Sequence, residues 1–410
     1  MMPEGTTENI ESSLVKINQM LLIRKIFKII LFGLGLIFLG SQLSDLIGSG
    51  ILHQDDFVEY WAAGRLNLSG ENPYDPESLF KLQKEVWPDR EEPLMMWNPP
   101  WTLALVMPFG YLSYNLARVL WIAGNFILVF LSINGIWHVY SGASRIRWIG
   151  WLVGLTFMPT VIALRIGQIS PLLLAGLAGF LLAIRDKRYY LAGMACSLLL
   201  FKPHLLSIFW LALAAWMIHQ RQYRIAIGCA IPLVFGSLLA LTMNPNVFQD
   251  YALSANNQPP TVWVTATIGA IIRLCFGANQ IWYQFVPFAL GVAWFGWYWA
   301  NNYQTWSWRY HMPLIVLASM VSAPFGWSFD QIVLLLAILP ITIWLIRDSN
   351  QMVITIFTAV YFLIQGLIFA INLLGLNYIW LVWVPPTFTM LYLILLSKHG
   401  QNQISSRQQA

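Results

Sequence analysis

The segment QMVITIFTAVYFLIQGLIFAINL, residues 351–373, decides the fold class because it contains no Asp, Glu, Lys or Arg. A helix needs about 20 predominantly apolar residues to cross the hydrocarbon core of a bilayer. Similar runs recur along the chain, and together they predict an all-α integral membrane protein. The twelve predicted spans are 26–47, 114–140, 148–166, 169–184, 189–202, 203–219, 224–243, 280–300, 311–325, 328–346, 351–373 and 377–397.

The composition excludes a water-soluble fold. Of the 410 residues, 58% are hydrophobic and 10% are charged, whereas soluble domains carry about 25% charged residues. The net charge of +5 does not indicate a nucleic-acid partner, since most Lys and Arg residues stand in short clusters between apolar runs. The spacing of Cys196, Cys229 and Cys275 fits neither a disulfide framework nor a metal site.

Basic residues predict the orientation, because they accumulate on the cytoplasmic side of a membrane. Those near the start of the chain place residues 1–25 in the cytoplasm and the loop 48–98 outside. Two further apolar pieces, 99–112 and 264–277, are too short to cross. If both enter the membrane and return, the later basic clusters and both termini become cytoplasmic. The prediction is one polytopic domain, 26–397, followed by a cytoplasmic tail, 398–410.

With that orientation, unusual polar residues gather at the outer membrane face. Ionisable groups near a bilayer are costly, and they need a partner or a water-filled cavity. Because these residues are far apart in sequence but share one depth, we predict that folding brings them into one pocket. They are Asp55, Asp56, Asn98, Arg165, Gln168, Lys202, His204, Trp327 and Asp330.

Several of these residues have simpler interpretations. Asp56 and Glu59 have the spacing of a capping box at the start of a helix over 57–68, which would explain one of two consecutive Asp residues. Arg165 and Lys202 could extend to the interface, although two lone cations on the outer side, each beside a helix-breaking Gly or Pro, favour an anion site. His204 is equally compatible with a structural role. Asp75 before a proline is predicted to be a plain helix cap.

The cluster contains the groups that glycosyl transfer from a lipid-linked sugar needs. Arg and Lys bind phosphate oxygens, and a carboxylate can take a proton from an attacking hydroxyl. The leaving phosphate needs its developing charge stabilised in place. The same groups could instead bind a lipid headgroup without chemistry.

Five motifs resemble glycosyltransferase family 87. They are DFVEYWAAGR (56–65), GENPYDP (70–76), WNPPW (97–101), RIGQ (165–168) and FKP (201–203). The resemblance extends over about residues 26–346. Family members are membrane-embedded enzymes of the GT-C class, best known from the polyprenyl-phosphate-mannose-dependent α-mannosyltransferases.

The resemblance implies a GT-C-type bundle of about 12 transmembrane helices with short re-entrant or interfacial helices. It also implies an inverting transfer of mannose or another hexose from a polyprenyl-phosphate sugar to a lipid or glycan acceptor. The active site would face the exoplasmic side of the plasma membrane. No nucleic-acid partner or cofactor is expected. Asp55 and Asp56 could hold a divalent metal, but the resemblance favours metal independence.

The resemblance also assigns roles to residues of the predicted pocket. It makes Asp56 the general base, since an aromatic residue and then Tyr60 follow it as in the family. Lys202 and Arg165, with His204 beside them, would bind the donor phosphate. Phe329 departs from the family, which often has His two residues after the tryptophan, so Asp330 or His204 would have to substitute. The remaining residues predicted to line the substrate pocket are Asp55, Tyr60, Asn98, Gln168, Trp327 and Asp330.

Two other functions remain as alternatives. A lipid or solute transporter, or flippase, would place ionisable groups near the membrane midplane at broken helices, whereas the predicted spans are nearly free of charge there. A non-catalytic scaffold would leave the outer polar residues apart. The arrangement of charge at one face therefore favours the enzyme.

Overall fold

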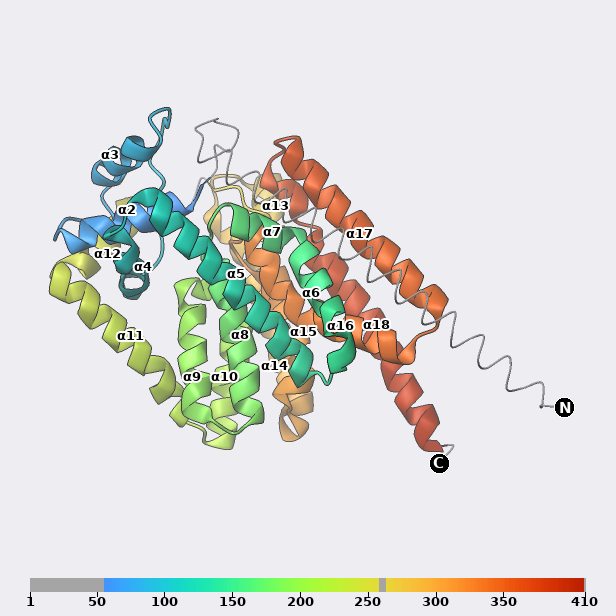
Figure 1. The fold of residues 1–410 in the computed structure, drawn as a ribbon. Coiled ribbons are helices and arrows are strands. Elements are labelled where there is room, and N and C mark those ends of the chain that lie inside the picture. The colour runs from blue at the N-terminus through green and yellow to red at the C-terminus, as the bar shows by residue number, and fades with distance from the viewer. Residues whose placement is uncertain (1–54, 258–262, 409–410) are drawn as a thin grey trace. The chain divides into compact units, whose positions relative to one another are not determined.

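The computed structural model describes residues 55–257 and 263–408, and this part of the chain contains helices and no strands (Figure 1). The predicted first span, 26–47, and the predicted cytoplasmic segment 1–25 lie outside the described residues. The first α-helices are α2 (Phe57–Leu68), α3 (Pro76–Val86), α4 (Leu103–Gly110), α5 (Tyr114–Val139), α6 (Arg147–Thr156), α7 (Met158–Arg165), α8 (Ser170–Arg185) and α9 (Tyr189–Ser197). The others are α10 (Ser207–Gln220), α11 (Arg224–Met243), α12 (Val247–Asn257), α13 (Ile268–Phe276), α14 (Val286–Asn302), α15 (Trp308–Ser322), α16 (Leu335–Asp348), α17 (Gln351–Leu373) and α18 (Val384–Gln408).

Several helices are long and apolar enough to cross a membrane. Within the described residues these are five segments, namely Tyr114–Val139, Arg224–Met243, Ser328–Asp348, Gln351–Leu373 and Tyr378–Ser397. Two bent helix pairs raise the number to seven if each pair counts as one span. The protein is therefore an all-helical membrane protein, while the number of twelve spans stays a prediction.

Proline causes both bends. Helix α7 begins with Met158 and Pro159, one residue after α6 ends, and the two helices meet at 62°. The proline has no amide hydrogen for the carbonyl of Leu155, and its ring would clash with that carbonyl in a continuous helix. The amide of Met158 donates instead to Oε1 of Gln365 at 2.8 Å. The second bend, of 118°, separates Tyr189–Phe201 from Pro203–Gln220. Lys202 stands at this break with a non-helical backbone (φ −142°, ψ 68°).

The two short apolar pieces form helices that are too short to cross. Within 99–112, a 3-10 turn leads into α4, which has eight residues, and α13 within 264–277 has nine. At about 1.5 Å per residue these helices extend less than half of the hydrocarbon thickness. Helix α4 crosses α2 at close range, because a Cβ atom on Gly64 would lie 2.7 Å from the carbonyl oxygen of Val106. This crossing fixes α2 against the helical domain.

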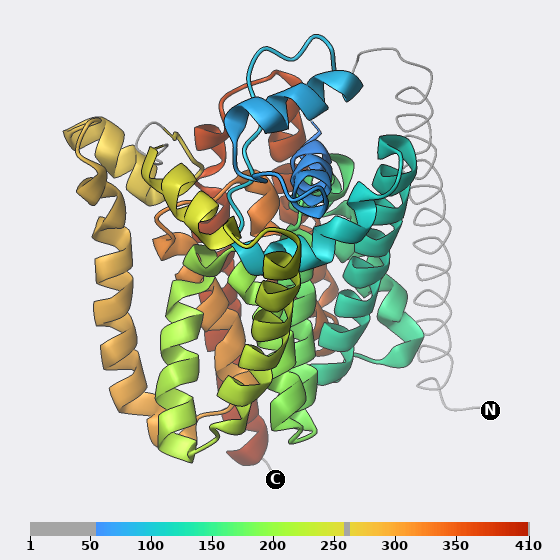
Figure 2. The same ribbon diagram turned by 90° about the vertical axis from the view of Figure 1, so that its left-hand side faces the viewer.

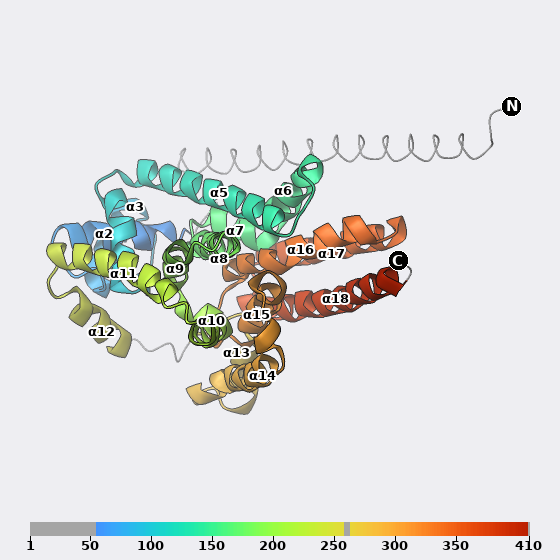
Figure 3. The same ribbon diagram turned by 90° about the horizontal axis from the view of Figure 1, so that it is seen from below.

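The segment Ser328–Asp348 is the centre of the larger core. It is 89% buried, compared with 22% for α11 and α17, which are therefore peripheral helices. Figure 3 shows α2, α11 and α12 on one side, α16 to α18 on the other, and α8, α10 and α15 between them. In Figure 2, α3 lies above α2 at the end where the predicted polar residues gather.

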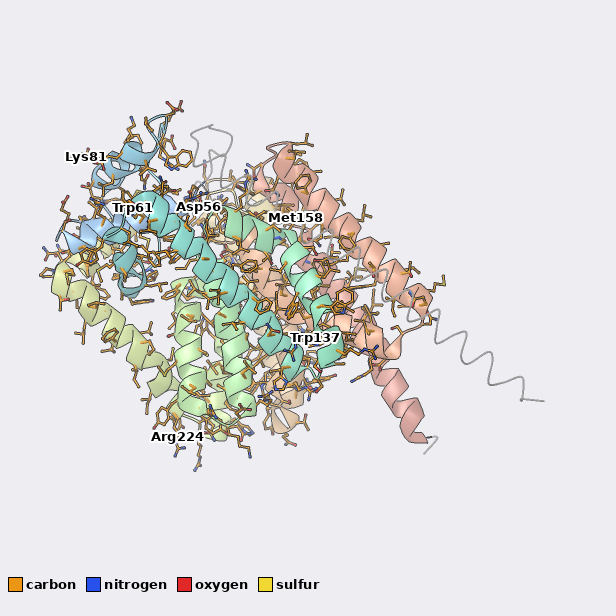
Figure 4. All side chains as sticks on the ribbon, in the orientation of Figure 1. Asp56, Trp61, Lys81, Trp137, Met158 and Arg224 are labelled. Atoms are coloured by element: carbon orange, nitrogen blue, oxygen red, sulfur yellow. The ribbon has the colours of Figure 1, made fainter. Side chains whose placement is uncertain are left out.

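The basic turns lie at the end opposite Asp56. Figure 4 shows Asp56 and Lys81 at one end of the helices and Arg224, at the start of α11, at the other. The turns from α8 to α9 and from α10 to α11 lie at that second end (Figure 1). There, the guanidinium of Arg309 donates to Oγ of Ser141 at 2.9 Å, which joins the start of α15 to the end of α5. The helices therefore separate the acidic first turn of α2 from the basic turns.

Candidate active site

The turn after α7 holds the first residues of α2. The amides of Asp56 and Phe57 both donate to the carbonyl of Ile166, at 2.8 and 3.2 Å. Gly167 has φ +69°, and a Cβ atom there would lie 2.7 Å from Cβ of Phe57. Its carbonyl accepts a hydrogen bond from Nε1 of Trp121 at 2.7 Å. Glycine is therefore required both for the left-handed backbone and for the close approach of α2.

Gln168 connects three of the predicted site residues. Its Nε2 atom donates to Oδ2 of Asp56 at 2.7 Å. Its Oε1 atom accepts from the hydroxyl of Tyr60 and from Nζ of Lys202, both at 3.0 Å. The structure therefore brings Asp56, Tyr60, Gln168 and Lys202 together, although they come from α2, the turn after α7 and the break after α9.

Residues 97–101 stabilise the helix break that carries Lys202. A bend leaves backbone carbonyls without helical partners, and buried carbonyls need other donors. Nδ2 of Asn98 donates to the carbonyl of Phe201 at 2.9 Å, and Nε1 of Trp101 donates to that of Leu200 at 3.2 Å. The hydroxyl of Tyr74 in turn donates to the carbonyl of Asn98 at 3.1 Å. Asn98 therefore supports Lys202 through the backbone.

Asp330 is the counter-ion of Lys202. Nζ of Lys202 lies 2.8 Å from Oδ1 of Asp330, whose side chain is fully buried. Oδ1 also accepts from the hydroxyl of Ser170 at 2.6 Å, and Oδ2 accepts from the amide of Trp327 at 3.0 Å. The ring of Phe329 lies 4.7 Å from Nζ, so the aromatic face also contacts the ammonium.

The two consecutive Asp residues face different surroundings. Asp56 precedes α2, but its side chain does not cap the helix; Oδ1 of Asp55 accepts from the amide of Phe57 instead, at 2.9 Å. Asp55 also contacts Tyr114 and Arg118, and it is 2% exposed, while Asp56 is partly exposed. Among the described residues, no three His, Cys, Asp or Glu side chains gather as a metal site would need.

Burial changes the acidity of the carboxylates on α2. It raises the pKa of Asp56 to about 6, assisted by the charge of Asp55 and opposed by the Gln168 hydrogen bond and by Lys202 and Arg90. Burial also raises the pKa of Glu59 well above its usual value, and the charge of Asp56 adds to this effect. A pKa near 6 leaves Asp56 mostly ionised at neutral pH, so that its carboxylate can accept a proton.

The model of glycosyltransferase family 87 matches residues 97–324, which is more than half of the chain. The chain belongs to glycosyltransferase family 87. The match confirms the resemblance, and it makes the protein a glycosyltransferase. Asn98, Gln168 and Lys202 lie within the matched residues, whereas Asp56 precedes them and Asp330 follows them. No curated protein and no solved structure matches the chain.

Two predicted residues of this family 87 glycosyltransferase lie beside the hydrogen-bonded cluster. Arg165 ends α7 with an exposed side chain, directly before the Ile166 carbonyl that holds Asp56. His204 lies two residues after Lys202 and packs edge-on against Phe325, with the ring centroids 6.4 Å apart. Its Nε2 atom is buried and has no hydrogen-bond partner among the described residues. Neither side chain contributes a hydrogen bond to the cluster.

Sequence reasoning missed several residues of the candidate site. Ser170 and Trp263 gave no signal, because a serine at a helix start and a tryptophan near an interface are common. Trp263 contacts both Trp97 and Trp327 edge-on, with ring centroids 4.7 and 5.4 Å away. Arg118 did give a signal, since it is the one Lys, Arg, Asp or Glu in α5, and an isolated charge in a span usually has a partner.

Proposed function

We propose that this glycosyltransferase transfers mannose or another hexose from a polyprenyl-phosphate sugar to a lipid or glycan acceptor at the exoplasmic face of the plasma membrane. The observation that supports this most directly is that Gln168 forms hydrogen bonds with both Asp56 and Lys202, at 2.7 and 3.0 Å. One amide holds a partly exposed carboxylate and an ammonium group at the same end of the helices. A base and an anion-binding cation at this spacing suit an acceptor hydroxyl and a donor phosphate.

In the proposed reaction Asp56 is the general base. Its carboxylate takes the proton from the acceptor hydroxyl while that oxygen forms a bond to the anomeric carbon. The bond from this carbon to the phosphate oxygen breaks, and polyprenyl phosphate leaves with the electron pair. Attack from the face opposite the leaving group inverts the configuration at carbon. Tyr60 donates to the same amide oxygen as Lys202 and helps to keep Gln168 turned toward Asp56.

Lys202 is the central donor-phosphate ligand of the proposal. Its side chain is 11% exposed, and Nζ contacts Asp330 and Gln168. Within the described part of the chain the ammonium has these two hydrogen-bond partners, which leaves a third donor position for a phosphate oxygen. Arg165 lies three residues before Gln168 and His204 lies two residues after Lys202. They would add a second cation and an imidazole. Asn98, Trp327 and Asp330 complete the predicted substrate pocket, whereas Asp55 is enclosed by protein donors.

The charge distribution supports the exoplasmic assignment. Asp56 lies at the opposite end of the helices from Arg224 (Figure 4), and basic residues accumulate on the cytoplasmic side. A polyprenyl phosphate keeps its tail in the hydrocarbon and its phosphate at the interface. The proposed site at the helix ends is therefore accessible to a donor that diffuses within the membrane.

The direct test uses purified full-length protein, radiolabelled polyprenyl-phosphate mannose and a membrane lipid extract as the source of acceptor. We expect labelled product that is sensitive to Asp56→Asn. Lys202→Ala and Arg165→Ala should each raise the donor KM. Transfer from a nucleotide sugar but not from the lipid-linked sugar would contradict the donor assignment, and unchanged donor KM in both variants would contradict the phosphate site.

A further inference from the structure

The carboxylate of Asp55 is enclosed by three donors. Its Oδ1 atom accepts from the amide of Phe57 at 2.9 Å. Its Oδ2 atom accepts from the hydroxyl of Tyr114 and forms an ion pair with Arg118. Asp55 is 2% exposed, so little of it is available to a substrate. A buried carboxylate with these partners is satisfied by the protein itself.

Helix α5 supplies two of these donors from one face. Tyr114 is its first residue and Arg118 follows one turn later, and residues four apart lie on the same side of a helix. The ring of Tyr114 also packs against Phe57 and Trp61, with centroids 5.9 and 5.6 Å away. The first turn of α2 is therefore attached to α5 by a salt bridge, a hydrogen bond and ring contacts.

The opposite side of this turn is attached to the segment after α7. The amides of Asp56 and Phe57 share the carbonyl of Ile166, and the side chain of Asp56 accepts from Gln168. Since successive side chains at a helix start point in different directions, fixing Asp55 toward α5 leaves Asp56 directed toward Gln168. We propose that Asp55 is a positioning residue, held by Tyr114 and Arg118, which aims the Asp56 carboxylate at the reaction centre. This role rests on the proposed function of Asp56 as base.

The same contacts determine the charge around Asp56. Asp55 and Glu59 place carboxyl groups near it, and Lys202 and Arg90 place cations near it. Removing the charge of Asp55 takes away one repulsive partner of Asp56. This change favours the ionised form of Asp56, so the pKa of Asp56 falls. A variant that only destabilised the fold would not shift the pH profile in this direction.

The experiment compares Asp55→Asn, Tyr114→Phe, the double variant and Asp56→Asn in full-length protein reconstituted in lipid nanodiscs. Asparagine keeps an oxygen for the Phe57 amide, and Tyr114→Phe removes one hydroxyl but keeps the ring contacts. We expect each single variant to lower kcat about tenfold, as for the loss of one hydrogen bond to a charged group, with the donor KM unchanged. The double variant should be little worse than either, because both remove the same contact.

The acid limb of the pH profile should move to lower pH in Asp55→Asn. The control is Asp186→Asn, which breaks an exposed Asp–Arg pair with Arg185 far along the chain and should change neither kcat nor the limb. A loss of turnover in Asp55→Asn as large as in Asp56→Asn would make Asp55 catalytic. A raised donor KM with normal kcat would make it a ligand. If neither kcat nor the position of the acid limb changes in Asp55→Asn, Asp55 has no positioning role.

A second readout separates this inference from the proposed function. The infrared carbonyl band that disappears in Asp56→Asn reports protonated Asp56 and can be titrated without any donor. We expect its midpoint to fall in Asp55→Asn. If the wild type transfers nothing from polyprenyl-phosphate mannose, the proposed function fails, and this titration alone tests the positioning role. An unchanged midpoint in Asp55→Asn overturns the positioning role. If Asp55→Asn does not fold, the kcat and KM of Tyr114→Phe decide.

Discussion

Nε2 of Gln168 donates a hydrogen bond to Oδ2 of Asp56 at 2.7 Å. The orientation of this amide follows from chemistry, because the Lys202 ammonium can only donate and must therefore face Oε1. The nitrogen is then the atom that faces Asp56. An amide donor favours the ionised carboxylate over the neutral acid, so Gln168 keeps Asp56 in the form that a general base requires.

Asp56→Asn should abolish the base while leaving the fold intact. Asparagine has nearly the same shape as aspartate, and the amide of residue 56 can still donate to Ile166. We expect kcat to fall by about 10²- to 10⁴-fold, the range for a lost general base, with little change in donor KM. Single-turnover kinetics with the labelled donor measure this loss. Near-normal turnover would exclude Asp56 as the base.

The pH dependence should report the same carboxylate. Because the pKa of Asp56 is raised to about 6 and only the ionised form accepts a proton, kcat/KM should rise with pH through about 6 and then level off. Gln168→Glu would add a like charge next to Asp56, which favours the neutral form. The limb in that variant should move to higher pH by about one unit. A limb that stays in place would show that Gln168 does not influence the titrating group.

Lys202 has two separable roles, in stability and in donor binding. Lys202→Met leaves the buried Asp330 carboxylate without its cation, and breaking a buried pair in this way costs about 3–5 kcal/mol. The double variant Lys202→Met with Asp330→Asn removes both charges, so most of the stability should return. Its donor KM should nevertheless stay high. Unfolding midpoints and donor KM of the two variants measure both effects, and a normal KM in the double variant would argue against a phosphate ligand at Lys202.

The peripheral spans could be predicted because their sequences carry the signal locally. Residues 351–373 and 224–243 form α17 and α11 with the predicted bounds, since an uninterrupted apolar run has one stable state in a bilayer. The predicted single span 148–166 is instead two helices bent by 62°. Pro159 marks the break in the sequence, but Gln365, which accepts from the amide of Met158 at the break, is more than 200 residues away and is set by tertiary packing.

The polar cluster could likewise be predicted only where the signal is local in the sequence. The sequence indicated that Asp56, Gln168 and Lys202 share one depth in the membrane, because each lies at a helix end or at a helix break. It could not indicate that Gln168 stands between the other two, since that depends on how the turn after α7 packs against α2. Likewise, Arg118 was visible as an isolated charge in a span, but its pairing with Asp55 depends on which face of α5 turns inward.

Glu59 should hold its proton to a higher pH than an exposed carboxyl does, and Glu59→Gln tests this. Glu59 is 7% exposed, and burial raises its pKa well above the usual value. In the unfolded chain the pKa of this carboxyl is about 4.3, which is lower than in the folded protein. Its contribution to stability is therefore fully present below about pH 4.3 and is lost as the pH rises through the folded pKa. Glutamine imitates the neutral acid and cannot ionise, so the variant should gain stability relative to wild type as the pH increases.

Unfolding midpoints measured over a range of pH in detergent decide between the two states of Glu59. The curves of wild type and Glu59→Gln should coincide at low pH and separate at high pH, with the variant more stable. If Glu59 keeps its proton where Asp56 titrates, the acid limb of kcat/KM does not move in Glu59→Gln, in contrast to Asp55→Asn. Parallel curves at every pH would show that Glu59 has the same pKa in the folded and in the unfolded protein, and so ionises like an exposed carboxyl. A limb shifted to lower pH would instead show that Glu59 is already ionised where Asp56 titrates, because removing a negative neighbour lowers the pKa of Asp56.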